Sequence, residues 1–411
     1  MLNIKAIPIT FVNIPKDILS RKQYIDKIKP FINKQIIKVI TGQRRVGKSY
    51  LLYQLIVELQ KEPDNHIIYI NKEDIAFSNI KNASQLHDFV KVHFNQKKMN
   101  YVFIDEIPEI EDFADALRSL LLIDNIDLYC TGSNAQLLSS DIAGHLSGRY
   151  IEITVYSLSY TEFLKFHSLK DNEANLDKYL KYGGLPYLKN LELKDHIVNE
   201  YLKNIYNSIV YRDIVNRYAI RNTRFLEQLV LFLADNIGSL FSSKKISDFL
   251  KSQKINMAPN QVQIYVQYLV NAFLLFKVSR YDIVGEKIFE IGEKYYFENL
   301  GIRNSITGYK INDLGKIMEN AVYNHLLFKG NKVQVGVIPH NEINFIAERD
   351  GEKSYFQVAL SIKQEKTWER EFGNLTKIKN HYPKYVITRE PWIGNSYKGI
   401  NTLSLRAFLK T

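Results

Sequence analysis

Residues 36–49 read Ile-Ile-Lys-Val-Ile-Thr-Gly-Gln-Arg-Arg-Val-Gly-Lys-Ser, and this stretch decides the fold of the first 150 residues. Its first six residues are mostly apolar and predict a short buried strand that runs directly into a loop with a glycine at each end. Apolar side chains at helical spacing over 48–60 predict that a helix begins at the lysine. Backbone N–H groups of such a loop can turn inward around phosphate oxygens, and a helix amino terminus adds its positive end. The stretch therefore predicts a phosphate-binding loop.

The spacing Gly-x4-Gly-Lys-Ser assigns a role to each part of this loop. Lys48 would reach the β- and γ-phosphates of ATP and assist catalysis, and the Ser49 hydroxyl would ligate Mg²⁺. So short a pattern also arises by chance in plain loops, but here the strand and the helix that the mechanism needs are both predicted. The predicted ATP-binding residues are Gly42, Gln43, Arg44, Arg45, Val46, Gly47, Lys48, Ser49 and Tyr50.

A second polar group follows the apolar run Tyr101-Val102-Phe103-Ile104, which ends on Asp105-Glu106. At the carboxyl edge of a buried strand, Asp105 would hold the Mg²⁺ through its water shell. Glu106, one residue further, would polarise the attacking water as a general base. Two alternatives stay open: the acids cap the next element, or the site is a nucleotide-binding switch that hydrolyses ATP slowly.

Two further polar positions are expected to complete the site. Ser133 and Asn134 follow a predicted strand at 127–131, so their side chains would face the γ-phosphate, with Asn134 in a catalytic role. Arg149 would stabilise charge in the transition state, either in cis or from an adjacent subunit of a homo-oligomer. The alternative for Arg149 is an ordinary solvated arginine. Cys130 is expected to be a buried strand residue.

The composition indicates a globular protein, which we expect in the cytoplasm. The chain has 411 residues, of which 45% are hydrophobic and 24% charged, and this length suggests roughly two to four domains. No apolar run approaches the ~18–20 residues needed to cross a bilayer, and the amino terminus lacks the pattern of a secretion signal, so no membrane partner is expected. The single cysteine excludes an internal disulfide, and no Cys/His cluster suggests zinc.

The net charge of +11 is concentrated in the later part of the chain. Residues 1–150 contain 19 Lys/Arg and 17 Asp/Glu, a net charge of +2, whereas the rest contains 36 and 27, a net charge of +9. A polyanionic partner such as nucleic acid would explain this distribution. A Lys-rich solvated surface would explain it equally well.

The pattern of elements predicts the α/β fold class and four regions. Strands that alternate with helices over 1–155 indicate a P-loop NTPase domain, with a parallel sheet and helices on both faces. Residues 156–223 are predicted to be helical, as a lid or linker with a turn at 182–186. Over 224–300, three helices and a β-hairpin follow one another in the order of a winged helix. Residues 301–411 return to mixed α and β.

Five short strings occur together in this chain. They are Thr-Gly-Gln-Arg-Arg-Val-Gly-Lys-Ser (41–49), Ile-Asp-Glu-Ile (104–107), Thr-Gly-Ser-Asn-Ala-x-Leu-Leu-Ser-Ser (131–140), Leu-Ser-Gly-Arg-Tyr (146–150) and Tyr-Gly-Gly-Leu-Pro (182–186). In this combination the chain resembles prokaryotic AAA+-type ATPases with a C-terminal domain of unknown function, over nearly its whole length. The resemblance implies an AAA-like core with Glu106 as the catalytic glutamate, a winged helix, and a terminal domain shaped like restriction endonucleases.

The implied endonuclease-like domain can be compared with the chemistry of a nuclease. Such folds place an acid on a helix, an aspartate on a strand and Glu-x-Lys on the next strand, all around Mg²⁺. The chain offers Glu319 for the helix, but Asn344 and Gln357 stand where the other two acids are expected, and Ala359 replaces the lysine. We therefore expect a nuclease-like domain without cleavage activity. A site rescued by Glu319 and Glu342 is the alternative.

Three functions are compatible with these features. The first is an Mg²⁺-dependent ATPase that couples ATP turnover to DNA binding through basic side chains of the winged helix. The second is a regulatory ATPase that acts on a protein partner, with the winged helix as a packing module. The third, an ATP-dependent nuclease, is disfavoured by the missing ligands. The candidate DNA-contacting residues are Lys244, Lys245, Lys251, Lys254, Gln261, Lys277, Arg280 and Lys287.

Overall fold

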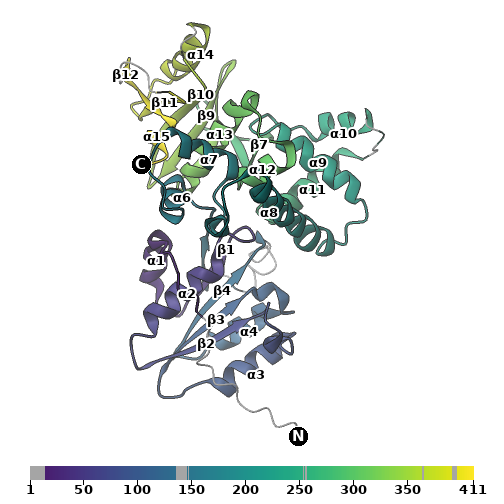
Figure 1. Cartoon of the computed structure of the whole chain (residues 1–411), viewed down its shortest axis with the longest axis vertical. Helices are drawn as coiled ribbons and strands as arrows, with labels where there is room; N and C mark the ends of the chain where they lie inside the picture. The colour runs from purple at the N-terminus through teal and green to yellow at the C-terminus, as the bar shows by residue number, and fades with distance from the viewer. Residues whose placement is uncertain are drawn as a thin grey trace. The chain divides into compact units, whose positions relative to one another are not determined.

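The chain divides into two compact units, Met1–Tyr156 and Ser157–Thr411 (Figure 1). The computed structural model describes residues 14–135, 146, 148–252, 254, 257–362, 365–390 and 396–411. Parts of two of the motif strings, at 136–140 and 147, lie outside the described residues. Within the described ranges, no helix is long and apolar enough to cross a membrane.

The first unit is a parallel five-stranded sheet with helices on both faces, which confirms the predicted α/β fold. Its strand order is β2-β3-β4-β1-β5, and every neighbouring pair is parallel. Helices α1 and α2 lie on one side of the sheet, and α3 and α4 on the other (Figure 1). The strands are β1 (Ile37–Thr41), β2 (Asn65–Asn71), β3 (Met99–Asp105), β4 (Ile126–Gly132) and β5 (Tyr150–Thr154). The helices are α1 (Lys22–Ile28), α2 (Lys48–Leu59), α3 (Ala83–His93) and α4 (Phe113–Leu120).

The strand order decides where polar side chains meet. In the sequence β4 follows β3, yet in the sheet it lies between β1 and β3. The carboxyl ends of β1, β4 and β3 therefore lie next to one another at one edge of the sheet. The glycine loop follows β1, Ser133 and Asn134 follow β4, and Asp105 ends β3. Three segments that are far apart in the sequence are thus brought to the same edge.

A buried ion pair ties β1 to β4 inside the otherwise apolar sheet. Lys38 on β1 and Asp127 on β4 are both fully buried and form a salt bridge. Asp127 also accepts hydrogen bonds from the Tyr129 hydroxyl at 2.8 Å and from the Asn33 backbone N–H at 2.9 Å. Removing one partner would leave an uncompensated buried charge, so the pair specifies how these two strands align. Cys130, also on β4, is buried as expected.

The second unit combines helices with a mixed eight-stranded sheet, in the order β12-β13-β11-β10-β9-β8-β6-β7. The strands are β6 (Leu275–Asp282), β7 (Lys287–Phe297), β8 (Lys332–Ile338), β9 (Asn341–Arg349), β10 (Glu352–Ala359), β11 (Lys384–Thr388), β12 (Ser396–Tyr397) and β13 (Ile400–Ser404). The helices are α6 (Tyr160–Phe166), α7 (Glu173–Tyr182), α8 (Asp195–Ser208) with a π-helical continuation (Ile209–Asn216), α9 (Thr223–Asp235), α10 (Ser243–Ser252), α11 (Pro259–Asn271), α12 (Leu300–Thr307), α13 (Leu314–Phe328), α14 (Glu365–Thr376) and α15 (Leu405–Phe408). The mixed α/β structure predicted for the end of the chain is confirmed.

The hairpin expected as the wing of a winged helix belongs to this larger sheet. The predicted order of three helices and a hairpin is present as α9, α10, α11 and β6–β7. However, β6 also pairs in parallel with β8, with Arg280 opposite Val335 and Asp282 opposite Val337. One edge of β6 pairs with β7 and the other with β8, so the parts expected at 224–300 and 301–411 share one sheet. A winged helix and a nuclease-like fold for these parts stay predictions.

The Tyr-Gly-Gly-Leu-Pro turn packs so closely that its glycines cannot carry side chains. Gly183 has a φ of 72°, and a Cβ there would lie 2.5 Å from the Asn299 side-chain oxygen. A Cβ at Gly184 would lie 2.3 Å from the Leu158 carbonyl oxygen. A Cβ at Gly301, in α12, would lie 1.9 Å from a backbone oxygen of the turn. Close packing of the turn against α12 thus accounts for this motif.

Candidate functional site

The backbone of the loop between β1 and α2 requires glycine at both ends. Gly42 has a φ of 142° and Gly47 a φ of 99°, values that residues with a Cβ rarely adopt. A Cβ at Gly42 would also lie 2.2 Å from the carbonyl oxygen of Val155, just after β5. The loop therefore winds tightly against the end of β5 before α2 begins at Lys48.

The Lys48 ammonium is held inside this loop. The side chain is buried, and Nζ donates hydrogen bonds to the carbonyl oxygens of Gly42 at 2.9 Å and Gln43 at 3.0 Å. A positive charge is thereby fixed among the backbone groups that would surround phosphate oxygens. The position of Lys48 fits the role predicted from its place in the motif.

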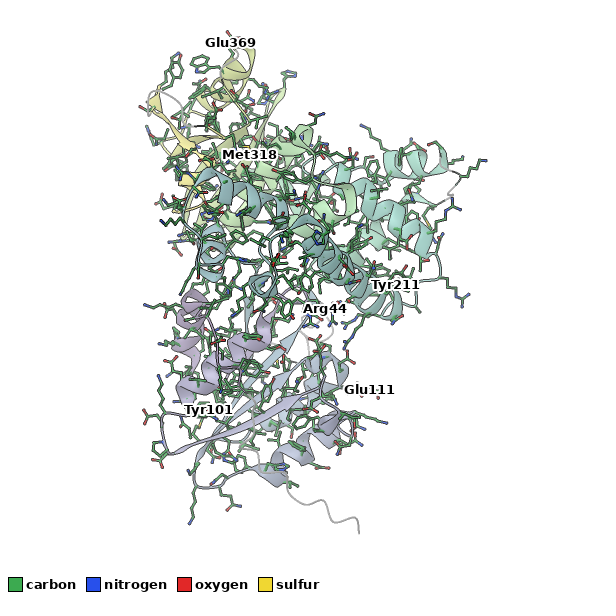
Figure 2. The ribbon with its side chains drawn as sticks, in the orientation of Figure 1. Arg44, Tyr101, Glu111, Tyr211, Met318 and Glu369 are labelled. Atoms are coloured by element: carbon green, nitrogen blue, oxygen red, sulfur yellow. The ribbon has the colours of Figure 1, made fainter. Side chains whose placement is uncertain are left out.

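The other predicted nucleotide-binding side chains differ in exposure. Arg44 is buried, and its Nη1 lies 3.4 Å from Glu73 Oε1, beyond the end of β2. In Figure 2, Arg44 marks the edge of the sheet at which the loop lies. Arg45 is exposed and has a φ of 69°, while the Tyr50 side chain is 45% exposed. Contacts from Arg44, Arg45 and Tyr50 to a nucleotide stay predictions.

Asp105 ends β3 beside three hydroxyl groups. Thr131 Oγ1 donates to Asp105 Oδ1 at 2.5 Å, and the Tyr69 hydroxyl donates to Oδ2 at 3.2 Å. The Ser49 hydroxyl also hydrogen-bonds to this carboxylate. Burial raises the pKa of Asp105 above its ordinary value, although the hydrogen bonds from Ser49 and Thr131 act in the opposite direction. The two residues predicted to hold Mg²⁺, Ser49 and Asp105, therefore lie beside one another.

Glu106 experiences a different environment from its neighbour. Its backbone is in the left-handed region, with φ 57° and ψ 56°, and its N–H donates to Thr131 Oγ1 at 2.9 Å. Ser133 donates to Glu106 Oε1 twice, from its hydroxyl at 2.6 Å and from its N–H at 3.3 Å. Burial opposes ionisation, but the charge of Lys48 and the hydrogen bonds from Ser133 outweigh it, so the pKa of Glu106 lies below its ordinary value. Glu106 is therefore a carboxylate at neutral pH, as a general base must be.

The positions of Asn134 and Arg149 give less support to the roles predicted for them. Asn134 is fully buried just after β4, but the side chain that contacts Glu106 comes from its neighbour Ser133. Arg149 immediately precedes β5, and its side chain is exposed. Catalytic roles for Asn134 and Arg149 stay predictions.

Three supporting residues were not predicted from the sequence. Thr131 and Tyr69 hold the Asp105 carboxylate, and the Arg21 guanidinium supports the loop by donating to the Val46 carbonyl oxygen at 3.1 Å. Thr131 could have been found, because it stands at the end of the strand next to the acids. Tyr69 could be predicted only if the register of β2 against β3 were known. Arg21 precedes α1 and belongs to no motif, so nothing in the sequence pointed to it.

The groups at this edge fit a nucleoside triphosphate with Mg²⁺. The loop has glycines with positive φ at both ends, so no side chain at these positions blocks the backbone N–H groups from phosphate oxygens, and the buried Lys48 supplies positive charge. A hydroxyl and a carboxylate in contact, from Ser49 and Asp105, are the oxygen ligands that Mg²⁺ prefers. Next to them, Glu106 offers an ionised carboxylate that can accept a proton.

Comparison with protein families gives two matches. An AAA domain matches residues 34–164, and a domain of unknown function matches residues 173–313. The chain belongs to the AAA+ P-loop family. The resemblance stated from the motif strings is thereby confirmed, including the C-terminal domain of unknown function.

Relatives of this AAA+ chain share most of its length. A Haemophilus influenzae protein named as uncharacterized is 36% identical over 398 residues, covering 94% of this chain and 98% of its own. An uncharacterized protein of Methanocaldococcus jannaschii is 30% identical over 354 residues, covering 80% of this chain and 78% of its own. Among solved structures, the ORC1 protein of Aeropyrum pernix in complex with DNA gives a TM-score of 0.34 and 11% identity, covering 72% of this chain and 94% of that one.

The opposite pKa shifts of the adjacent acids predict opposite effects of amide substitutions on stability. A raised pKa means that Asp105 costs stability once the pH exceeds the ordinary aspartate value, so Asp105→Asn should raise the urea midpoint at pH 7. A lowered pKa means that ionised Glu106 stabilises the fold at pH 7 and loses this effect as the pH falls through the folded-state value. Glu106→Gln should therefore lower the midpoint. Urea unfolding followed by circular dichroism, without nucleotide and with EDTA, measures both.

The Asp105 difference should vanish below the ordinary pKa of aspartate, whereas the Glu106 difference should vanish only below the lowered folded-state pKa of Glu106, because each carboxyl group is then protonated in the folded and unfolded states alike. Shifts of the same sign in the two variants at pH 7 would contradict the two environments described for Asp105 and Glu106.

Proposed function

We propose that the chain binds ATP with Mg²⁺ at the loop of residues 42–49 and hydrolyses it. The observation that carries the proposal is that the loop with its buried Lys48 meets the Asp105 and Glu106 carboxylates at one edge of the sheet, with the Ser49 hydroxyl beside the Asp105 carboxylate. These last two groups come from the start of α2 and the end of β3, and they are the two that would hold the metal. Bound there, Mg²⁺ would neutralise charge on the β- and γ-phosphates.

The chain's own residues would then carry the reaction. Lys48 would exchange its hydrogen bonds to the loop carbonyls for phosphate oxygens and stabilise the charge of the transferring group. Glu106 would orient the attacking water and take its proton, and later release that proton to solvent. Both hydrogen bonds from Ser133 go to Glu106 Oε1, so the other carboxylate oxygen, Oε2, would meet the water.

The substitution Glu106→Gln should keep ATP bound and lower turnover by at least about 100-fold, since it removes the base but keeps the shape of the side chain. Lys48→Ala should lose ATP binding itself, because the positive charge in the loop is gone. Equilibrium binding of a fluorescent ATP analogue and phosphate release measure the two effects.

Glu111→Gln is the matched control, because Glu111 is an exposed acid on the same unit (Figure 2) and should leave both quantities unchanged. Undiminished phosphate release in the Glu106 variant would remove this residue from the mechanism.

A second part of the proposal couples ATP turnover to DNA through α10 and the residues after it. Lys244, Lys245 and Lys251 on α10 are exposed, whereas Ile246 and Leu250 on the same helix are buried. A helix that buries its apolar side chains and presents lysines can neutralise backbone phosphates. The runner-up is a regulatory ATPase whose C-terminal unit docks a protein partner instead.

In either case, Arg149 of one copy would act on the ATP site of another copy within a homo-oligomer.

The triple change of Lys244, Lys245 and Lys251 to Gln should weaken DNA binding by about tenfold or more at about 50 mM salt, because three phosphate contacts are lost. Filter binding at low and high salt measures the effect, and basal ATP hydrolysis should not change. Three exposed lysines of the first unit, Lys61, Lys91 and Lys97, changed together to Gln, provide a control with the same loss of charge. A parent chain that binds no DNA at low salt would favour the protein-partner alternative.

A further inference from the structure

In the second unit, the place expected for a nuclease centre contains a buried lysine. Glu319 on α13, next to the residue labelled Met318 in Figure 2, and Glu342 near the start of β9 are the acids that the sequence offers there. Lys294 of β7 reaches both of them: its Nζ lies 3.6 Å from Glu319 Oε1 and forms an ion pair with Glu342 Oε1. One ammonium group therefore bridges the two carboxylates.

Hydrogen bonds engage both oxygens of the Glu319 carboxylate. The Tyr296 hydroxyl donates to Oε1 at 2.5 Å, and Asn344 Nδ2 donates to Oε2 at 3.0 Å. Tyr296 stands two residues after Lys294 on β7, so both side chains leave the same face of the strand. A carboxylate that ligates Mg²⁺ or Mn²⁺ must offer oxygen lone pairs to the metal, and protein donors, Lys294 included, occupy most of those of Glu319.

The two amides in the expected ligand positions are bound to the backbone. Asn344 Oδ1 accepts a hydrogen bond from the Val358 N–H at 2.9 Å, and Gln357 Oε1 accepts one from the Asn344 N–H at 2.7 Å. These bonds join β9 to β10. The side chains that replace the metal-binding acids therefore act as cross-links between strands.

The charge of Lys294 also opposes a metal ion. Lys294 is only 5% exposed. Burial alone would lower the pKa of its ammonium group, but the carboxylates of Glu319 and Glu342 hold that pKa above the ordinary value. The ammonium group is therefore charged at neutral pH. A divalent cation would be repelled by it, and displacing it would leave a buried charge without partners.

We infer that Lys294 takes the place of the metal ion in this nuclease-like centre, so that the centre binds no divalent cation and cleaves no nucleic acid. The buried ammonium instead ties β7 to α13 and β9, which makes the centre a structural link between the hairpin and the rest of the unit. This inference is independent of ATP binding, since every residue that carries it lies in the second unit.

The test compares the parent with its variants in the amount of Mn²⁺ bound per chain. Binding is measured without nucleotide, from the electron paramagnetic resonance signal of free Mn²⁺. The parent and Glu342→Gln should bind equal amounts, because the centre contributes no site. Lys294→Met should gain one Mn²⁺ per chain, since the Glu342 carboxylate and the remaining lone pairs of Glu319 are then released to bind it, and Lys294→Met with Glu342→Gln should lose it again. Lys287→Met removes an exposed lysine of the same strand and should gain none.

A Mn²⁺ ion that the parent binds and Glu342→Gln loses would overturn the inference, as would Mn²⁺-dependent cutting of DNA or RNA that disappears in that variant. A folded Lys294→Met chain without an additional Mn²⁺ would also overturn it. Circular dichroism establishes whether Lys294→Met folds, and if it does not, the comparison of the parent with Glu342→Gln decides alone.

Discussion

The candidate site depends on the position of β4 between β1 and β3. Neighbouring strands lie roughly 4.8 Å apart, and each strand inserted between two others adds one such spacing to the distance between them. The order of the strands therefore fixes how far the glycine loop lies from the acids. The Thr131 hydroxyl of β4 uses this proximity, since it donates to Asp105 and accepts from the Glu106 N–H. Toward the other end of the strands, the buried pair of Lys38 and Asp127 aligns β4 with β1.

Adjacent acids acquire different properties at this edge. Asp105 is buried among hydroxyl groups and is costly to ionise, a cost that a bound cation would offset. Glu106 lies within reach of the charge of Lys48 and accepts two hydrogen bonds from Ser133, so it ionises readily. One site therefore contains two carboxylates with opposite pKa shifts, although the two residues are neighbours in the sequence. The difference comes from their partners: Asp105 meets the hydroxyl groups of Thr131 and Tyr69, whereas Glu106 meets Ser133 and the charge of Lys48.

Local patterns predicted much of the first unit. The strand, loop and helix around Lys48 and the acids after residues 101–104 are each contained in a short stretch, and the alternation of strands and helices implies the parallel sheet. Tyr69 and Arg21 were missed because their contacts depend on pairing between distant segments. Ser133 was placed near the site, yet its bond to Glu106 depends on the exact turn after β4.

In the second unit the important contacts are longer in range, and the sequence predicted less. The hairpin was expected as an isolated wing, whereas β6 pairs with β8 across more than fifty residues of chain. Lys294 was part of that expected wing, so its ion pairs with acids on α13 and β9 had no sequence signal. The absence of the metal ligands expected of a nuclease was visible from Asn344 and Gln357, but the cation between Glu319 and Glu342 was not.

The Mg²⁺ dependence of ATP affinity, measured for the parent and for Asp105→Asn, tests the central claim most directly. Mg²⁺ should tighten the binding of an ATP analogue to the parent, because Ser49 and Asp105 would together hold the metal against the phosphates. In Asp105→Asn this tightening should largely disappear, while Mg²⁺-independent binding through Lys48 and the loop persists. Equal tightening in both proteins, or a parent that takes up no ATP analogue with Mg²⁺ present, would contradict the account.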